Sequence, residues 1–188
     1  MSNSEFSKPA SGRRRFISRT LGLAAGLSVA GEAPALVLRS ETDRTLGFHN
    51  LHTSESLKCC YWSSGSYDPV ALEDIAYVLR DHRADAVEDI DPRLLDLLTV
   101  VRRKLDSREL YHVISGYRSP QTNAKLRAKS NGVAKKSLHM QGKAIDVRLP
   151  GVELAELRQT ALDLKAGGVG YYPKSNFVHL DVGRPRFW

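Results

Sequence analysis

The sequence predicts an α+β domain in which a small antiparallel sheet carries the functional site and is packed by several helices. Three observations support this class. Two strand-like runs flank a polar turn near the start of the domain, two Asp-Pro dipeptides open amphipathic segments, and two short strand-like runs flank a Pro-Lys-Ser turn near the C-terminus. Such runs, bounded by turn residues and interspersed with helical periodicity, are typical of a mixed architecture.

Residues 1–35 are predicted to be an export signal rather than part of the fold. The pair Arg13-Arg14 precedes an apolar segment at residues 21–30, which is too short to span a bilayer as a stable helix. Small residues then follow, as they do at a signal cleavage site. This order resembles a twin-arginine signal, so we expect the twin-arginine translocase as a partner and a periplasmic domain at residues 36–188.

The charge of the chain suits an anionic polymer more than a nucleic acid. The formal net charge is +7, and five basic against two acidic residues in the leader account for +3 of it, which leaves +4 for the domain. No basic run with interleaved aromatics follows the leader, so we predict no nucleic-acid partner. No later segment is long and apolar enough to be a transmembrane helix. The adjacent Cys59 and Cys60 are expected to remain unpaired, because neighbouring cysteines rarely bridge each other.

The first half of the domain is predicted to be a β-hairpin followed by two helices. Residues 44–53 alternate apolar and polar side chains, and residues 56–62 are rich in strand formers. Each Asp-Pro dipeptide offers a capping carboxylate followed by a proline at the first helical position. Apolar residues then recur at helical spacing, which predicts helices over residues 68–82 and 91–104.

The second half alternates predicted strands with predicted helices. A helix is expected to begin at the capping residue Ser119, and Gly167-Gly168 is expected to end the last helix. Residues 125–136 carry five basic side chains and are predicted to form a flexible, solvated rim beside the site. The remaining predicted elements are strands at 111–115, 144–149, 169–172 and 176–182 and a helix at 152–164.

The decapeptide SLHMQGKAID carries the strongest functional signal. It holds His139 and Asp146, and imidazole and carboxylate are two of the ligand types that zinc takes. Gly142 suits a turn between a loop that delivers the histidine and a strand that delivers the carboxylate. Further on, His179 and Asp181 alternate with apolar neighbours, so on a strand they share one face and can point at one metal.

Four blocks in this order resemble the zinc D-Ala-D-Ala metallopeptidases, which share their fold with the hedgehog signalling domain. Within that group the chain is most similar to the short bacterial murein endopeptidases of the YcbK type. The resemblance covers about residues 44–188 and rests on residues 79–83, residues 115–120, the SLHMQGKAID segment, and residues 167–173 running into 176–181.

The resemblance implies a catalytic zinc ion held by His139, Asp146 and His179. It also implies that Arg118 binds and polarises the substrate, and we place Ser137 within hydrogen-bonding reach of the metal or substrate. The reaction implied is hydrolysis of a D-amino-acid-containing peptide cross-link in peptidoglycan.

One position departs from the pattern of the wider family. Several relatives carry Glu or Asp three residues before the last histidine ligand, whereas this chain has Asn176, which cannot accept a proton as a base. Asp181 is the nearest carboxylate and is the candidate general base. The alternatives are that Asp181 orients a histidine or is itself a ligand.

Two other functions remain open at this point. A D,D- or L,D-carboxypeptidase that trims stem peptides would use the same zinc site, and a non-hydrolytic, metal-containing wall-binding module would need no base. The sequence leaves the oligomeric state open.

Overall fold

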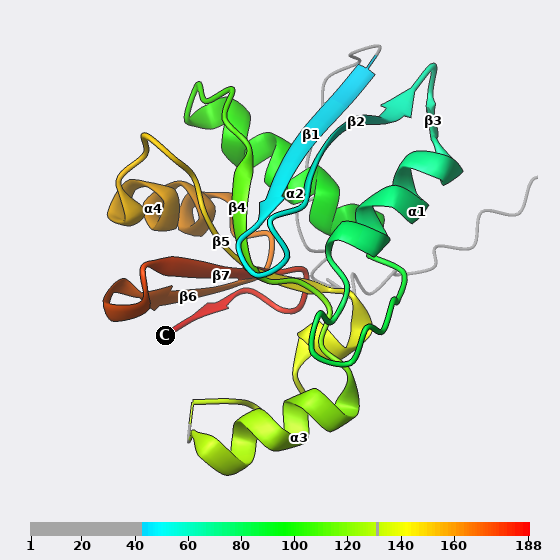
Figure 1. The fold of residues 1–188 in the computed structure, drawn as a ribbon. Helices are drawn as coiled ribbons and strands as arrows, with labels where there is room; N and C mark the ends of the chain where they lie inside the picture. The colour runs from blue at the N-terminus through cyan, green and yellow to red at the C-terminus, as the bar shows by residue number, and fades with distance from the viewer. Residues whose placement is uncertain (1–42, 131) are drawn as a thin grey trace, which may run out of the picture. The chain divides into compact units, whose positions relative to one another are not determined.

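A computed structural model describes residues 43–130 and 132–188, so the predicted export signal at residues 1–35 lies outside the described residues. Within this part, eight strands form one sheet in the order β3-β2-β1-β4-β5-β7-β6-β8 (Figure 1). The strands are β1 (Asp43–Asn50), β2 (Ser56–Ser63), β3 (Ser66–Tyr67), β4 (Tyr111–Ser115), β5 (Ala144–Arg148), β6 (Gly168–Tyr172), β7 (Phe177–Asp181) and β8 (Arg186–Phe187). The α-helices are α1 (Pro69–Val78), α2 (Pro92–Lys104), α3 (Pro120–Lys129) and α4 (Leu154–Leu164), and the 3-10 helices are η1 (Leu138–Gln141) and η2 (Pro173–Ser175).

The α+β class is confirmed, but the sheet is neither small nor purely antiparallel. The predicted hairpin forms, with β1 antiparallel to β2. The chain then passes through β3, α1 and α2 before β4 pairs with the free edge of β1, and this long crossover makes the pair parallel. At the other edge, the two-residue strand β8 is parallel to β6. A strand of two residues has no alternation to detect, so its pairing was not predicted.

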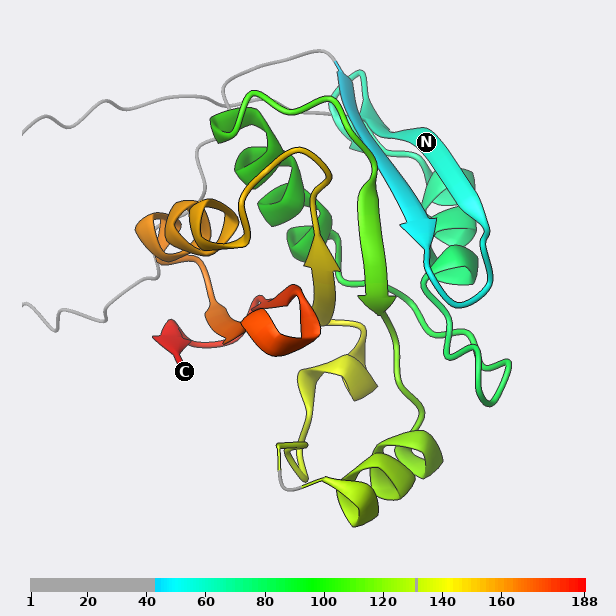
Figure 2. The same cartoon turned by 60° about the vertical axis from the view of Figure 1, so that its left-hand side comes forward.

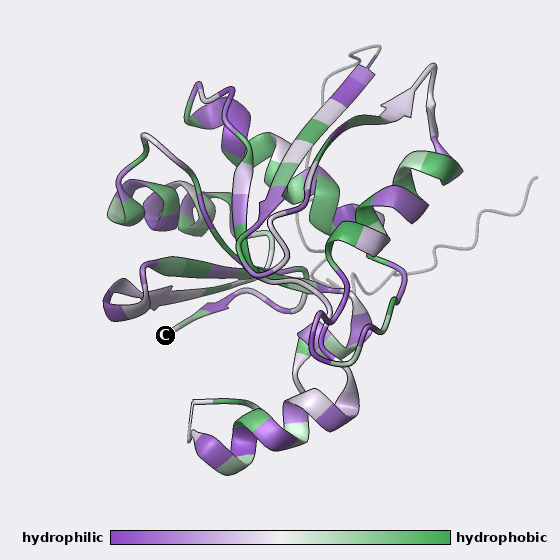
Figure 3. Ribbon diagram, in the orientation of Figure 1, coloured by the Kyte–Doolittle hydropathy of each residue, from purple (hydrophilic) through white to green (hydrophobic). Residues whose placement is uncertain are grey.

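The central strands separate a hydrophobic core from a polar site by simple alternation. Ile145 and Val147 of β5 and Val178 and Leu180 of β7 are fully buried in the core. The residues between them therefore point to the opposite face of the sheet. Helices α1, α2 and α4 and the other long strands add further residues to this core, and Figure 3 shows hydrophobic residues along the central strands and α2.

The predicted helix starts are confirmed by their caps. Asp68 accepts hydrogen bonds from the first-turn N–H groups of α1, Asp91 does so for α2, and Ser119 does so for α3. Helix α4 ends at Leu164, as predicted, but the expected terminator is wrong: Lys165, with φ of 51°, occupies the left-handed position instead of the glycine pair. Both cysteines are free, as expected.

Helix α3 lies beyond the end of β4, apart from the other three helices, in both views of the ribbon (Figures 1 and 2). It buries only two residues, Thr122 and Asn123, and both are polar. Helix α3 is therefore the one α-helix of the described chain that contributes no apolar face to the core. Across the described residues, no helix is long and apolar enough to cross a membrane.

Candidate metal centre

Three elements bring the predicted ligands together. His139 lies on η1, Asp146 on β5 and His179 on β7, and the last two are direct partners across the antiparallel pair. Gly142 ends η1 with φ of 61°, the left-handed conformation expected of a glycine turn, and the backbone then enters β5. A Cβ at this glycine would overlap the carbonyl oxygen of Asp89, so the turn has no room for a side chain.

The three side chains form a compact triangle that is almost closed to solvent. Oδ1 of Asp146 lies 2.8 Å from Nδ1 of His179 and 3.2 Å from Nε2 of His139, and the two nitrogens are 3.2 Å apart. All three residues are buried. Around a tetrahedral zinc ion with bonds of about 2.0–2.1 Å, neighbouring ligand atoms are about 3.3 Å apart. The spacing of these three atoms therefore fits a metal ion of this kind.

In each histidine, the hydrogen bond of the ring nitrogen that faces away from Asp146 determines whether the nitrogen that faces Asp146 carries a proton. Nδ1 of His139 lies 2.7 Å from the carbonyl oxygen of Gly116, and Nε2 of His179 lies 3.0 Å from Oδ2 of Asp181. Both partners are acceptors, so both ring nitrogens donate a proton to them. In neutral rings the nitrogens that face Asp146 then carry lone pairs. Two such lone pairs and a carboxylate oxygen repel one another, so the cluster is stabilised either by a proton on a ring nitrogen, which then donates to Asp146, or by a metal cation between the three atoms.

The charges of the cluster agree with this interpretation. Burial alone would raise the pKa of Asp146, but the two adjacent histidines outweigh it and hold that pKa well below its usual range. Burial would likewise lower the pKa of His179, yet its hydrogen bonds to Asp146 and Asp181 raise it. The site thus attracts positive charge, and a bound metal ion would supply that charge without protonating the ligands.

Asp181 lies behind His179 and does not join the triangle. Its side chain is fully buried, and the two guanidinium nitrogens of Arg186 donate to its two oxygens at 2.6 and 3.0 Å. The backbone N–H groups of Gly168 and Gly183 also donate to Oδ1. A carboxylate with this many donors, on the far side of a ligand ring, is poorly placed to take a proton from a water molecule at the centre. The geometry therefore opposes the predicted base role and favours the alternative, in which Asp181 orients His179.

Gly168 makes this arrangement possible, and the sequence pattern did not reveal its role. A Cβ built on Gly168 would lie 2.4 Å from both Oδ2 of Asp181 and Nη1 of Arg186. A side chain at this position would displace the ion pair that supports His179. The only sequence signal was a glycine-rich run, which indicated the end of a helix. It did not indicate that two side chains lie against the backbone at this glycine.

Arg118 and Ser137 both line the cavity at the cluster. Arg118 is buried, and its Nη2 lies 3.4 Å from Oδ2 of Asp146 and 3.1 Å from Oγ of Ser115. Its Nε atom is buried and has no hydrogen-bond partner in the described part of the chain. A guanidinium with unused donor capacity beside the cluster is suited to bind an oxygen atom of a ligand. Ser137 is also buried, and its side chain does not cap η1.

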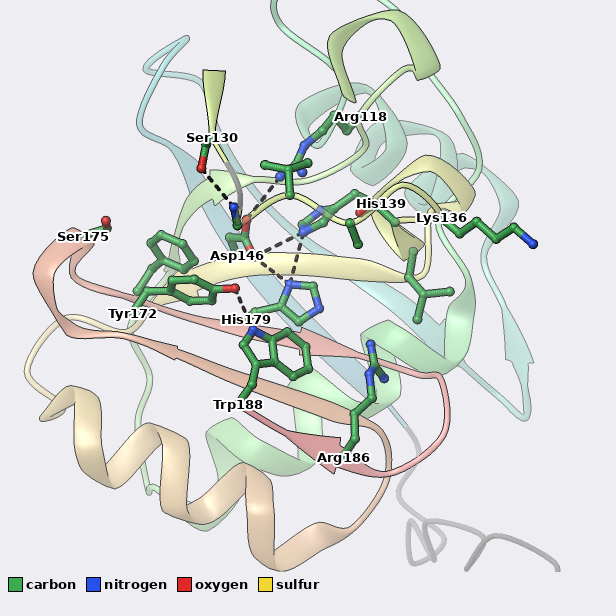
Figure 4. Close-up of a pocket in the computed structure, with 16 residues that line it drawn as sticks. Arg118, Ser130, Lys136, His139, Asp146, Tyr172, Ser175, His179, Arg186 and Trp188 are labelled. Carbon is green, nitrogen blue, oxygen red and sulfur yellow. Dashed lines mark hydrogen bonds and ion pairs between the residues drawn. The ribbon is translucent and has the colours of Figure 1, made fainter. Parts of the chain in front are cut away.

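The cavity above the triangle has a volume of about 490 Å³ and two contrasting walls (Figure 4). One wall is aromatic: Tyr172 stacks on Phe177, and the Trp188 indole donates to the Tyr172 hydroxyl at 2.7 Å. The other wall comes from the segment after α3, including Ser130 and Lys136. Among the described residues that line the cavity, only Asp146 is acidic.

Asn176, the position at which several relatives carry a carboxylate, does not face this cavity. It has φ of 53° at the end of η2, is exposed, and lines a separate cavity with His112 and Arg148. The absence of a carboxylate at position 176 therefore leaves the His139, Asp146 and His179 cluster unchanged.

The chain is similar to bacterial peptidoglycan endopeptidases over nearly its whole length. A model of an M15 peptidase family, described as "Peptidoglycan L,D-endopeptidase MepK", matches residues 39–188. Peptidoglycan L,D-endopeptidase MepK of Escherichia coli K12 is 42% identical over 175 residues, which cover 93% of this chain and 96% of that protein. A probable peptidoglycan L,D-endopeptidase MepK of Haemophilus influenzae is 39% identical over 168 residues, which cover 89% of this chain and 90% of that protein. With these matches, the chain belongs to the MepK family of M15 peptidases.

Proposed function

We propose that this protein is a zinc-dependent murein endopeptidase, which hydrolyses the peptide cross-links of peptidoglycan during remodelling of the cell wall. The observation that carries the proposal is the convergence of Nε2 of His139, Nδ1 of His179 and Oδ1 of Asp146, which lie 2.8 to 3.2 Å apart beside an open cavity. The names of the E. coli and H. influenzae relatives support peptidoglycan as the substrate and endopeptidase as the activity.

His139, Asp146 and His179 would hold the zinc ion. When bound, it would polarise the scissile carbonyl and lower the pKa of a water molecule. Arg118 lies 3.4 Å from Asp146 and lines the cavity, so we assign it to the carbonyl oxygen or a carboxylate of the substrate. Ser137 lines the same cavity and is assigned to hydrogen bonding with the substrate.

Asp181 is assigned to the orientation of His179 rather than to proton transfer. Carboxylate partners fix the tautomer and the ring orientation of metal-binding histidines. Here Asp181 accepts the proton on Nε2, which leaves Nδ1 free to face the centre. Arg186 and two backbone N–H groups hold the carboxylate in turn, so the ring is fixed from behind by a buried network.

Residues 1–35 would direct the chain through the twin-arginine translocase to the periplasm, where residues 36–188 would act as a single peptidase domain. The support for this part comes from the order of the arginine pair, the short apolar segment and the small residues that follow. Peptidoglycan as a substrate is consistent with a periplasmic location.

Digestion of purified sacculi tests the proposal, because each candidate function leaves a different product pattern. An endopeptidase converts cross-linked muropeptide dimers to monomers. A carboxypeptidase shortens only the free ends of stem peptides, and a wall-binding module changes neither. We expect dimers to disappear with the wild-type protein and to persist with His139→Ala; unchanged dimers with zinc-loaded wild-type protein would refute the proposal.

A further inference from the structure

The segment from α3 to η1 has a charge pattern that the metal centre does not explain. No Asp or Glu occurs between Leu110 and Ile145. Within this stretch, five exposed cations follow the first turn of α3, and we call them the basic rim: Lys125, Arg127, Lys129, Lys135 and Lys136. None of the salt bridges found among the described residues involves any of the five. Within the described part of the chain, the rim is thus a surface of positive charge without acidic partners.

Polar contacts, rather than an apolar face, hold the rim in place. Oδ2 of Asp81 accepts from the backbone N–H of Ser119 at 2.9 Å, which fixes the start of α3. The side-chain amide of Asn123 donates to the carbonyl of Ala134 at 3.1 Å and ties the returning segment to the helix. Because α3 buries no apolar residue, packing in a hydrophobic core does not account for its presence. Figure 3 shows hydrophilic residues of α3 alternating with hydrophobic ones.

The rim continues directly into the cavity of the metal centre. Ser130, Val133 and Lys136 line that cavity together with His139. In Figure 4 the Lys136 side chain extends outward from the edge of the cavity, away from His139. A peptide whose scissile bond lies at the triangle, and which leaves the cavity on this side, passes Lys136 and approaches the segment that carries the other four cations.

We propose that the basic rim is a binding surface for the carboxylate groups of the peptidoglycan peptide, outside the metal centre. This inference rests on the proposed function, which places that peptide in the cavity. Charge complementarity favours an acidic peptide, because five cations without counterions attract carboxylates at short range. A nucleic acid fits less well, because no aromatic residue lies between Ser119 and Leu138 to stack with bases.

Co-sedimentation of the protein with purified sacculi tests the rim without requiring catalysis. The test variant is Lys125→Gln/Arg127→Gln/Lys129→Gln, which removes three charges and keeps good helix formers. The matched control is Lys58→Gln/Lys104→Gln/Arg108→Gln, which also removes three exposed charges. Lys104 and Arg108 precede β4, whereas α3 follows it, so these two control positions lie toward the opposite end of that strand.

Each exposed ion pair contributes a small amount to binding. Because the rim variant removes three such cations, we expect it to bind sacculi roughly tenfold more weakly than the wild type. The control should bind within about twofold of the wild type, since it leaves the rim intact. Sacculi whose carboxylates have been amidated should bind the wild type and the rim variant equally weakly. Added salt should reduce the advantage of the wild type, because exposed charges are screened.

Three results would overturn the inference. These are equal binding by the rim variant and the control, undiminished binding of the wild type to amidated sacculi, and tighter binding of the wild type to a poly-dT oligonucleotide than to sacculi. The experiment distinguishes failure of the proposed endopeptidase activity from failure of the proposed binding role of the rim. Rim-dependent binding without any cleavage would contradict the endopeptidase, whereas cleavage without rim-dependent binding would contradict the rim alone.

Discussion

Nε2 of His179 lies 3.0 Å from Oδ2 of Asp181, on the side of the ring opposite the nitrogen that faces Asp146. The aspartate therefore contacts the metal centre only through the histidine. This relationship favours a partner that positions a ligand over a base that acts on the substrate, two roles that the sequence left open.

Asp181→Asn should weaken metal binding while the domain stays folded. The amide keeps the size of the side chain but offers one acceptor oxygen instead of two, so its NH2 group must face either Nε2 of His179 or the N–H groups that donate to Oδ1, and its hold on the ring is weakened. Loss of such a partner typically costs about 10–100-fold in metal affinity. Competition with a fluorescent zinc chelator measures the affinity, and near-UV circular dichroism checks the fold. Wild-type zinc affinity combined with lost cleavage would instead restore the base role.

Arg118→Lys should reduce kcat/KM for dimer cleavage by roughly 100-fold, the scale seen when one donor to a developing charge is lost. Lysine keeps the charge but lacks the planar guanidinium, whose Nη2 contacts both Ser115 and Asp146 and whose buried Nε has no hydrogen-bond partner among the described residues. Zinc content should remain at the wild-type level, because Arg118 is not a ligand. Parallel kinetics and metal analysis decide the matter, and a variant that loses zinc as well would show that Arg118 supports the ligands rather than the substrate.

Asp81→Asn should destabilise the protein at neutral pH and progressively less in acid. Burial would raise the pKa of Asp81, but hydrogen bonds from Thr122 and Ser119 and from the backbone of Arg83 outweigh it and lower that pKa. A lowered folded-state pKa means that the stabilisation is complete above the unfolded value of about 3.9 and is lost as pH falls through the folded value.

Urea unfolding at pH 7 and at pH 3 measures this effect. We expect a loss of about 1–3 kcal/mol at pH 7, the cost of weakening contacts to a buried carboxylate. The difference between wild type and variant should shrink at pH 3. A difference that does not depend on pH would mean that Asp81 contributes through shape rather than charge.

Cys59 should react slowly with iodoacetamide in the folded protein. Burial, with a smaller contribution from the nearby Asp74, raises the pKa of the Cys59 thiol to about 11. Because the thiolate is the reactive form and an ordinary cysteine has a pKa of about 8.5, alkylation at pH 8 should be on the order of 100-fold slower than in urea. Peptide mass spectrometry after timed labelling gives the rate, and similar rates in folded and unfolded protein would disprove the shift.

The sequence predicted the local elements well because their signals are local. The caps Asp68, Asp91 and Ser119 and the glycine turn at Gly142 are each determined by a few neighbouring residues. The parallel pairing of β4 with β1 was missed, since it depends on where a long crossover returns the chain.

At the candidate site, the sequence could identify the residues but not how their side chains are arranged relative to one another. Strand alternation places His179 and Asp181 on one face. It does not show that Asp181 is turned back toward Arg186 and Gly168 and is saturated with donors there. That arrangement depends on a residue of β8 and a close approach in β6, neither of which has a periodic signature.

Zinc content measured together with dimer cleavage tests the central claim most directly, with His139→Ala beside the wild type and His52→Ala as the matched control on an exposed histidine. The wild type and His52→Ala should each retain about one zinc ion per chain, as a single three-residue site predicts, and should cleave dimers. His139→Ala should lose both zinc and cleavage. Full zinc content in His139→Ala, or cleavage by metal-free wild-type protein, would contradict the assignment of this cluster as the metal centre of a peptidase.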